Sequence, residues 1–493
     1  MTMKRSSGIL MHITSLPGPY GIGTLGKEAY AFVDFLEMAG QKYWQILPLG
    51  PTGFGDSPYQ SFSSFAGNPY LIDLELLAEA GLLQIENFNY VDFGVCEEKV
   101  DYKKIYEYKL PILRKAYQCN KRNNLYEIES FKRDNHHWIE DYALYMALKG
   151  YFQMKPWRDW EKSIRQREVD ALEQYKKLLE DEMNYWIFLQ YLFLKQWKDL
   201  KKYANERKIQ IIGDIPIYVA EDSADTWANS HIFSLDEEKT PKWIAGCPPD
   251  AFSEIGQLWG NPIYRWDVLE KSGYDWWIER IRSTLNLYDV IRIDHFRGFE
   301  SYWEIPYGSS TAATGRWVKG PAMKLFDAVK EKLGDIAIIA EDLGFLTEEV
   351  IQFRKNSGYP GMKVLQFAFD SREESDYLPH NYEKNCVVYT GTHDNDTMMG
   401  WMKNANPQDV IYAKEYLQLT EEEGYHWGFI RAAWASVGVL AIAPIQDFLG
   451  LDSGCRMNIP STIGGNWQWR IQKEALTKEL AKKIYQITRR YGR

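Results

Sequence analysis

Cysteine is scarce in this sequence, and its spacing indicates neither a metal site nor a redox site. The five cysteines are an odd number spread over 493 residues, and no C-x-x-C pair occurs among them. A zinc ribbon and a thioredoxin-type site both need such a pair, so neither is indicated. The cysteines are Cys96, Cys119, Cys247, Cys386 and Cys455.

Long hydrophobic runs are also missing. No apolar stretch approaches the roughly 20 residues that a membrane-spanning helix needs. Residues 1–18, "MTMKRSSGILMHITSLPG", carry two basic residues, but their apolar run is short and ends in Pro and Gly. This pattern predicts a buried strand and not a signal peptide. We therefore expect a cytoplasmic protein.

Basic residues do not outnumber acidic ones. The chain has 58 Lys and Arg against 68 Asp and Glu, which gives a formal net charge of -10. Nucleic acids and anionic membrane surfaces both require clustered Lys and Arg, so we expect neither as a partner. A neutral or cationic ligand suits this balance better.

Aromatic residues are abundant instead: 19 Trp, 33 Tyr and 22 Phe make up 15% of the chain. Most of these rings are expected in a large hydrophobic core. Some could line a groove and stack on a flat, neutral ligand. Composition alone does not separate these two interpretations.

A glycine-rich segment at residues 21–28, "GIGTLGKE", resembles two nucleotide-binding motifs. The dinucleotide fingerprint fails because "TSLPGPY" separates the preceding strand from Gly21, and no acid lies about 20 residues further on. The P-loop motif fails because Glu28 stands where a Ser or Thr should bind magnesium. We expect a turn at the top of the first strand and no nucleotide.

Eight short apolar runs alternate with helical patterns along the chain. Most are continuously apolar, which is typical of strands buried on both faces. Eight strand–helix units predict an α/β fold, a (β/α)8 TIM barrel; an open doubly wound sheet has no need of eight. The runs are 8–13 "GILMHI", 43–49 "YWQILPL", 209–219 "IQIIGDIPIYV", 288–296 "YDVIRIDHF", 335–344 "DIAIIAEDLG", 362–370 "MKVLQFAFD", 386–394 "CVVYTGTHD" and 437–449 "VGVLAIAPIQDFL".

The spacing of these runs predicts a single catalytic barrel, residues 1–493, with two insertions. Residues 53–180, after the second strand, are charged and helix-prone, and we expect a mainly helical insertion. Residues 219–272, after the third strand, are rich in Pro, Gly and Trp, and we expect a loop-rich insertion beside a ligand groove. One helix follows the last strand, and we expect no C-terminal β-domain.

Three strands of this barrel end in acids, at the edge where barrel enzymes place their catalytic groups. Arg292 and Asp294 are two residues apart and point to the same side of a strand, so the Arg should lower the pKa of Asp294 and keep it ionised. Glu341 ends an apolar run, which should raise its pKa. His393 and Asp394 follow the next strand but one. Each acid alone is more often a helix cap, but several at one rim indicate a site.

Two chemistries use acids in this way. A metal site could recruit His295, His393 and Glu341, but the chain has only eight His, and Arg292 would compete with a metal cation. Glycosidic bond chemistry needs one ionised and one protonated carboxyl group, which Asp294 and Glu341 would supply. The second interpretation also explains the surplus of aromatic rings, and it predicts no metal or organic cofactor.

Six segments of the chain, in order, closely resemble those of the 4-α-glucanotransferases, also called amylomaltases or disproportionating enzymes, which are relatives of the α-amylases. The resemblance runs from "GILMHITSLPG" nearly to the C-terminus, and six long motifs are far more specific than one glycine pattern. The segments are 55–72 "GDSPYQSFSSFAGNPYLI", 213–227 "GDIPIYVAEDSADTW", 248–266 "PPDAFSEIGQLWGNPIYRW", 292–299 "RIDHFRGF", 340–344 "AEDLG" and 392–397 "THDNDT".

The resemblance implies retaining transfer of α-1,4-glucan segments, from a malto-oligosaccharide or amylose to another glucan or to glucose. It makes Asp294 the nucleophile, Glu341 the acid/base and Asp394 the stabiliser of the transition state. It also implies substrate-binding roles, with Arg292 orienting Asp294, Asp214 supporting the cluster, Tyr59 as a stacking platform and a Trp-bearing loop over the groove. The implied binding residues are Arg292, His393, Asp214, Tyr59, Ser57, Trp259 and Asn261.

The residues leave other functions open. A retaining α-glucan hydrolase would use the same carboxylates, because transfer and hydrolysis share the covalent intermediate. Trp259 is equally consistent with a lid that excludes water and with an aromatic that packs the insertion on the barrel. A non-catalytic glucan-binding protein is disfavoured, since binding alone has no need of both Asp294 and Glu341. The preference for transfer rests on the resemblance.

Overall fold

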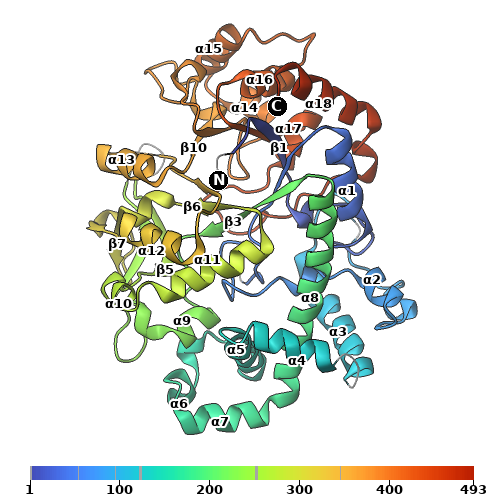
Figure 1. The fold of residues 1–493 in the computed structure, drawn as a ribbon, viewed down its shortest axis with the longest axis vertical. Helices are drawn as coiled ribbons and strands as arrows, with labels where there is room; N and C mark the ends of the chain where they lie inside the picture. Colours follow the sequence, from blue (N-terminus) through green and yellow to red (C-terminus); the bar gives the residue numbers. More distant parts are fainter. Residues whose placement is uncertain (1–2, 54, 95, 122–124, 250–253, 345) are drawn as a thin grey trace.

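The computed structural model describes residues 3–53, 55–94, 96–121, 125–249, 254–344 and 346–493. Within these ranges, eight parallel strands follow one another round a barrel in the order of the sequence (Figure 1). Each predicted apolar run overlaps one of them, so the predicted (β/α)8 barrel is confirmed. The strands are β1 (Ser6–Leu10), β2 (Tyr43–Gln45), β3 (Gln210–Pro216), β6 (Val290–Asp294), β9 (Ile338–Ala340), β10 (Gly361–Val364), β11 (Cys386–Tyr389) and β12 (Leu440–Pro444).

Hydrogen-bonded ladders join each pair of neighbouring barrel strands except β9 and β10. Seven neighbouring pairs of strands share parallel registers, from β10–β11 round to β6–β9. Between β9 and β10 the amide of Ala340 donates to the carbonyl of Pro360 at 2.9 Å. The sheet is therefore nearly closed, and the gap lies next to the strand that precedes Glu341.

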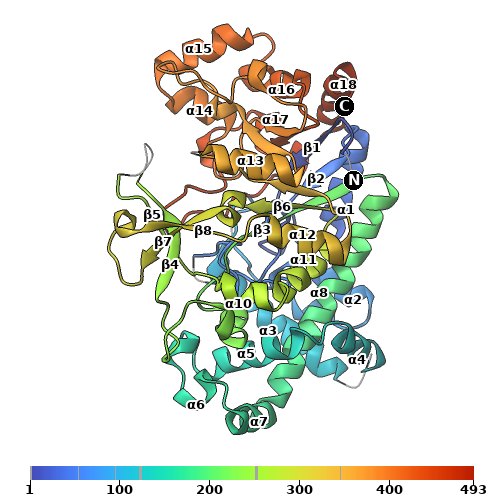
Figure 2. The same cartoon turned by 60° about the vertical axis from the view of Figure 1, so that its left-hand side comes forward.

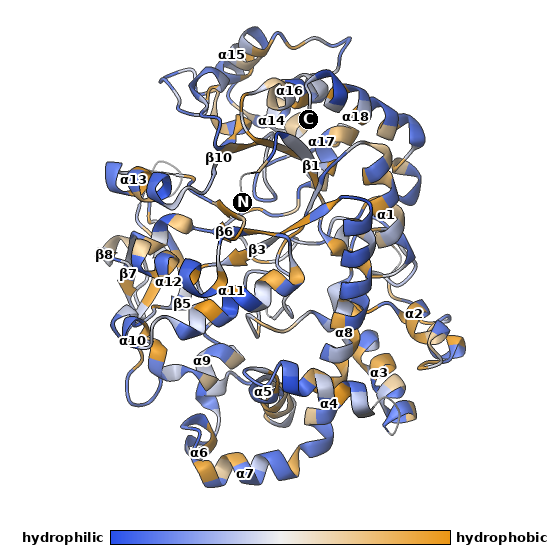
Figure 3. Cartoon of the chain, viewed as in Figure 1, coloured by the Kyte–Doolittle hydropathy of each residue, from blue (hydrophilic) through white to orange (hydrophobic). Residues whose placement is uncertain are grey.

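The barrel strands are continuously apolar because both of their faces are buried. Every residue of β1, β11 and β12 is buried. Gly8 on β1 is needed for close approach, because a Cβ there would lie 2.7 Å from the Cβ and from the carbonyl oxygen of Tyr43 on β2. Figure 3 shows the apolar strands surrounded by helices that are polar on their outer side.

Helices surround the barrel, as the helical patterns between the apolar runs predict. Two of them end at glycines in the left-handed region, Gly334 (φ 76°) and Gly358 (φ 72°), because a residue without Cβ adopts this conformation without strain. The crossover from β10 to β11 differs: it contains only the 3-10 turns η8 (Leu365–Phe367) and η9 (Pro379–Asn381). The helices of the barrel are α1 (Lys27–Met38), α8 (Glu180–Glu206), α11 (Asp275–Leu287), α12 (Met323–Leu333), α13 (Glu348–Ser357), α14 (Met398–Asn404), α15 (Pro407–Leu417), α16 (Tyr425–Ala435), α17 (Ile445–Leu449) and α18 (Lys478–Arg490).

A helical layer extends from the barrel between β2 and β3 and occupies the lower part of Figure 1. Its centre is α5, which packs on the long helix α8 and on α9 (Ala224–Ala228). These helices share a hydrophobic core of their own, built from aromatic residues such as Trp138, Tyr142 and Trp227. The helices of this layer are α2 (Leu74–Glu79), α3 (Tyr102–Asn120), α4 (Leu125–Asp134), α5 (Ile139–Tyr151), α6 (Lys162–Arg165) and α7 (Val169–Leu178).

A second, antiparallel sheet lies beside the barrel, and the sequence did not predict it. Strands β4 (Trp243–Cys247) and β5 (Gln257–Pro262) belong to the segment that we expected to be loop-rich, together with α10 (Trp266–Lys271). They pair with β7 (Ser301–Pro306) and β8 (Arg316–Lys319) in the order β5-β4-β7-β8 (Figure 2). The pairs β4–β5 and β7–β8 each lie within one crossover, and the β4–β7 ladder that joins them links segments distant in sequence.

The glycine-rich turn before α1 is explained by close packing. A Cβ on Gly23 would lie 1.8 Å from the carbonyl oxygen of Ile13, and one on Gly26 would lie 2.1 Å from a carboxylate oxygen of Asp73. Protein atoms thus occupy the side of the turn where a nucleotide-binding loop would hold phosphate. Among the described residues, no helix has both the length and the apolar character needed to cross a bilayer.

Candidate active site

The carboxylates predicted from the sequence meet at the C-terminal ends of the barrel strands. Asp214 lies on β3, Arg292 and Asp294 lie on β6, and Glu341 follows β9 directly. Asp394 follows β11 after a short turn. In a (β/α)8 barrel these ends form one rim, which is where the catalytic groups of such enzymes lie.

Arg292 holds two of these carboxylates. Its Nη1 donates to Oδ2 of Asp214 at 2.5 Å and to Oδ1 of Asp294 at 3.0 Å. The side chains of Arg292 and Asp214 are 4% and 0% exposed, whereas that of Asp294 is 32% exposed. The side chain of Asp214, which we had grouped with the substrate-binding residues, is thus fully buried in contact with Arg292.

The pKa of Asp294 differs from the sequence-based prediction. We expected Arg292 to lower it, and the positive charge of Arg292 does act in that direction. Burial of the carboxyl group has the larger effect, and together with the negative charge of Asp214 it raises the pKa of Asp294 to about 6. Asp294 is still mostly ionised at neutral pH, as a nucleophile must be.

Glu341 is held by the backbone. The amide of His295 donates to its Oε2 at 2.6 Å, and the amide of Leu343 donates to its Oε1 at 3.0 Å. His295 adopts a left-handed conformation (φ 52°), which aims its amide at Glu341. Burial, and then the charge of Asp294, raises the pKa of Glu341 to about 8. The pKa of Glu341 is thus higher than that of Asp294. At neutral pH this leaves Glu341 protonated and Asp294 ionised, as acid/base chemistry requires.

A loop near the C-terminus contributes residues that the sequence analysis missed. Nδ2 of Asn458 donates to Oδ1 of Asp394 at 2.6 Å, and Nη2 of Arg456 donates to the backbone carbonyl of Asp394 at 2.5 Å. The amide of Asn458 also donates to the carbonyl of His393 at 3.1 Å. The signal in the sequence was the run "NIPSTIGGNW" (458–467), a loop rich in Gly and Asn that follows the last strand.

Tyr59 is packed into the site from one side. Its hydroxyl donates to Oδ2 of Asp214 at 2.8 Å, and its ring stacks on that of His393, with centroids 5.2 Å apart and planes at 13°. Trp467 lies tilted against both rings, 5.9 Å from each. A stacking platform on Tyr59 is therefore limited to the face of the ring that points away from His393.

The remaining predicted binding residues have different surroundings. Trp259 on β5 is partly exposed and lies edge-on against His295, with ring centroids 4.8 Å apart. Asn261 is buried, and its Nδ2 donates to the carbonyl of Val219 at 2.8 Å, so it anchors the second sheet to the end of β3. Ser57 accepts from the amide of Tyr59 at 3.2 Å and shapes the turn that carries the tyrosine.

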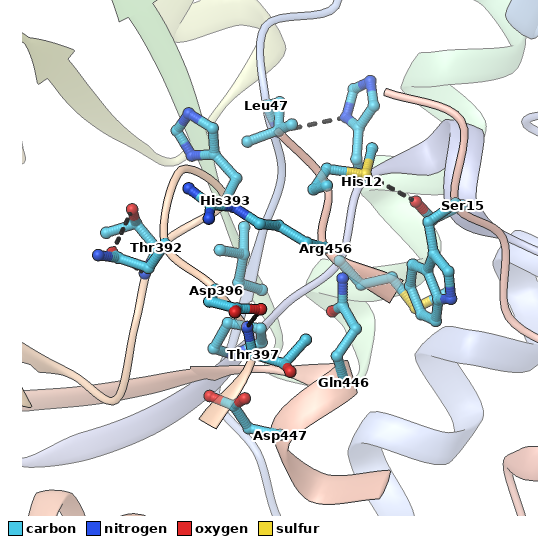
Figure 4. Close-up of a pocket in the computed structure, with 16 residues that line it drawn as sticks. His12, Ser15, Leu47, Thr392, His393, Asp396, Thr397, Gln446, Asp447 and Arg456 are labelled. Atoms are coloured by element: carbon cyan, nitrogen blue, oxygen red, sulfur yellow. Dashed lines mark hydrogen bonds between the residues drawn. The ribbon is translucent and has the colours of Figure 1, made fainter. Parts of the chain in front are cut away.

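A small cavity of about 30 Å³ lies behind His393 and Arg456, large enough for a water molecule or two (Figure 4). His12 lines it, and Nδ1 of His12 accepts from the amide of Leu47 at 3.2 Å. Burial, followed by the nearby His393, lowers the pKa of His12 to about 3, so the ring is neutral and its proton lies on Nε2.

The described residues contain no cluster of three His, Cys, Asp or Glu side chains arranged to hold a metal ion. His295 and His393, which a metal site would recruit, are instead packed against the rings of Trp259 and Tyr59. The site therefore contains three carboxyl groups. Asp294 is an ionised carboxylate bound by Arg292, and Glu341 is a protonated carboxyl group bound by two backbone amides. Asp394 is a third carboxylate, bound by Asn458.

Comparison with known proteins agrees with this arrangement. A family model described as "4-alpha-glucanotransferase" matches residues 11–477. A 4-alpha-glucanotransferase from Clostridium butyricum is 56% identical, over 98% of this chain and 100% of the relative, and one from Streptococcus pneumoniae is 52% identical, over 99% and 98%. The solved amylomaltase from Streptococcus agalactiae in complex with acarbose is 46% identical, covers 99% of this chain and 100% of its own, and has a TM-score of 0.97.

The fold and the site define a (β/α)8-barrel enzyme with a carboxylate pair of the kind that acts on glycosidic bonds. The family match covers most of the chain, and relatives at half identity or more span its whole length. The chain belongs to the 4-alpha-glucanotransferase family and is an enzyme of that class.

Proposed function

We propose that this protein transfers segments of α-1,4-glucan from a donor malto-oligosaccharide or amylose to the 4-hydroxyl group of an acceptor glucan or glucose, with retention at the anomeric carbon. The observation that carries the proposal is the opposite state of the two carboxyl groups at one rim. Asp294 is ionised beside Arg292, and Glu341 is protonated at neutral pH, its pKa raised to about 8.

In the first step, a carboxylate oxygen of Asp294 attacks the anomeric carbon and forms a β-glucosyl ester. The bond to the glycosidic oxygen breaks, and Glu341 gives its proton to that oxygen, so the reducing-end fragment leaves as an alcohol. Loss of the negative charge on Asp294 and gain of one on Glu341 keep the total charge of the pair constant. The amides of His295 and Leu343 stabilise the Glu341 carboxylate that forms.

In the second step, Glu341 accepts the proton of the acceptor's 4-hydroxyl group, whose oxygen attacks the anomeric carbon. The ester bond to Asp294 breaks, and Asp294 is again an ionised carboxylate bound by Arg292. Two inversions give overall retention. The reaction needs no metal or organic cofactor, because side chains supply the nucleophile, the acid and the base.

Asp394 acts on the sugar in the transition state. Its side chain is 43% exposed, so it can accept hydrogen bonds from hydroxyl groups of the reacting ring. Asn458 fixes one of its oxygens, which keeps the other available for the sugar. Hydrogen bonds to the sugar that strengthen as positive charge develops lower the barrier.

Transfer requires that a sugar, and not water, reach the glucosyl ester. Trp259 and the free face of Tyr59 are apolar surfaces next to the rim, and an acceptor ring that stacks on them would displace water. A retaining hydrolase with the same carboxylates would lack an apolar surface that favours a sugar acceptor over water. This is the structural argument for transfer.

The proposal is tested by incubating the purified protein with maltotriose alone and following the products by mass spectrometry. Transfer predicts a ladder of longer oligosaccharides together with free glucose. Shorter sugars only, with reducing ends that rise as bonds are cut, would identify a hydrolase. Unchanged sugars, both with maltotriose and with amylose plus glucose, would contradict an enzymatic function and favour a binding protein.

We further propose that the protein acts in the cytoplasm. The exposed Cys96 and Cys119 are free thiols, which is typical of a reducing compartment. Fractionation of the source cells tests this: transfer activity should appear in the cytoplasmic fraction, and recovery from the medium or envelope would contradict it.

A further inference from the structure

A second, larger cavity lies between the helical layer and the barrel. Its volume is about 570 Å³, within the range of small-molecule sites. It is lined by α5, α9 and α11 and by the segment after β2; α11 lies near the centre of Figure 1, and α9 and α5 lie below it. None of its lining residues belongs to the site described above.

Aromatic rings form one wall of this cavity. The ring of Phe65 stacks on that of Trp138, with centroids 6.3 Å apart and planes at 14°, and meets the ring of Trp276 edge-on at 6.1 Å. Trp276 is partly exposed, yet among the described residues its buried Nε1 has no hydrogen-bond partner. Because this N–H is buried, a ligand in the cavity meets the partly exposed part of the Trp276 ring and not its Nε1.

The charged residues of the cavity disfavour an anion. Four carboxylates line it against two cationic side chains, so phosphate-bearing ligands would be repelled. The lining carboxylates are Asp141, Asp225, Asp275 and Glu279, and the cations are Arg282 and Lys332.

Most of these carboxylates already have partners, so the cavity does not need a cationic ligand either. Arg167 binds Asp141 at 2.6 Å, and the amide of Ser64 donates to Asp225 at 2.7 Å. Glu279 accepts from Arg282 at 2.5 Å, and Nε2 of His137 lies 3.4 Å from it. A neutral ligand with hydroxyl groups on an apolar ring suits both the paired charges and the aromatic wall.

We propose that this cavity is a second glucan-binding site, in which a glucosyl ring packs against the exposed part of the Trp276 ring. The proposal rests on the proposed function, because it takes the enzyme's own substrate as its ligand. A long glucan held here stays close to the barrel between transfers, whereas transfer between short glucans depends on the catalytic rim alone. The site should therefore lower KM for amylose and leave maltotriose transfer unchanged.

The test uses the full-length chain in two backgrounds. In Asp294→Asn, which cannot turn over, calorimetric titration with maltotriose should give binding at the rim and at one further site. Adding Trp276→Ala should weaken the further site at least tenfold, and Trp276→Phe, which keeps a smaller ring, should weaken it less. In the active enzyme, Trp276→Ala should raise KM for amylose severalfold with kcat and maltotriose transfer unchanged.

Tyr90→Ala is the matched control, because Tyr90 is an aromatic residue that is 86% exposed and lies outside the cavity. Ala228→Trp, which fills the cavity from α9, is a second test that does not depend on the folding of Trp276→Ala. Binding at the rim alone, unaltered by these changes, would overturn the second site and leave the transfer function intact. Absence of maltotriose binding together with absence of transfer by the unmodified enzyme would overturn both.

Discussion

Arg292 and Asp214 face each other on neighbouring strands, and Nη1 of Arg292 lies 2.5 Å from Oδ2 of Asp214. The same nitrogen lies 3.0 Å from the carboxylate of Asp294. Since Asp214 is fully buried, it influences the reaction through Arg292 and through its own charge. The state of the nucleophile thus depends on a residue that the substrate does not reach.

Replacing Asp214 by Asn should reduce kcat by roughly 10²-fold with little change in KM, because Arg292 and hence Asp294 lose their position. The Asp214 charge raises the pKa of Asp294, so its removal should lower that pKa and move the acidic limb of the pH profile to lower pH. Steady-state kinetics from pH 4 to 9 measure both effects. Asp225→Asn, which changes another buried carboxyl group, should leave the limb in place, and an unmoved limb in Asp214→Asn would contradict the coupling.

The pH dependence of transfer should be bell-shaped. Activity needs Asp294 ionised and is lost as pH falls through about 6; it needs Glu341 protonated and is lost as pH rises through about 8. Because Asp294 and Glu341 interact, the apparent pKa values of the two limbs belong to the pair and not to either residue alone. The profile of kcat/KM for maltotriose is the measurement, and full activity at both pH 4 and pH 10 would show that these groups do not carry the reaction.

Replacing Asn458 by Ala should lower kcat by about 10- to 100-fold, because Asp394 loses the donor that fixes one of its oxygens. Asn458→Asp should be more damaging, since a second negative charge would face Asp394. The control is Asn466→Ala in the same loop, whose side chain bonds Thr462 and Ile459 and not the carboxylate. Equal loss of activity in Asn458→Ala and Asn466→Ala would show that activity depends on the loop as a whole and not on the hydrogen bond to Asp394.

Tyr59 offers two changes that separate its hydroxyl group from its ring. Tyr59→Phe removes the hydrogen bond to Asp214 but keeps the stack on His393, so kcat should fall severalfold while the ratio of transfer to hydrolysis stays constant. Tyr59→Ala removes the ring surface, and hydrolysis should gain relative to transfer. Free reducing ends counted against newly formed long oligosaccharides give the ratio; equal ratios in the two variants would exclude a role of the ring in acceptor binding.

Much of the barrel could be predicted because its strands are short, apolar and buried on both faces, a pattern visible in each strand by itself. The acids at the strand ends were visible for the same reason: they interrupt apolar runs at the rim. The second sheet was not predicted, because its two halves, β5–β4 and β7–β8, lie in different crossovers and are joined by the β4–β7 ladder.

The finer features of the site depend on contacts between distant segments. Asn458 meets Asp394 across 64 positions of the chain, and no spacing rule links them. The pKa of Asp294 was predicted in the wrong direction, because the neighbouring Arg292 can be read from the sequence, whereas the depth of burial cannot. Asp214 was visible as a strand-end acid, but only its complete burial shows that it positions Arg292 and does not touch the sugar.

The measurement that tests the account most directly is capture of the glucosyl-enzyme. Glu341→Gln should still react with an α-maltosyl fluoride, whose leaving group needs no acid, but it lacks the base for the second step. The account predicts that mass spectrometry of the digested protein finds a maltosyl group on the peptide that contains Asp294, and that Asp294→Asn in the same background abolishes it. A maltosyl group on another residue, or efficient turnover of the fluoride in the absence of Asp294, would contradict the proposed nucleophile.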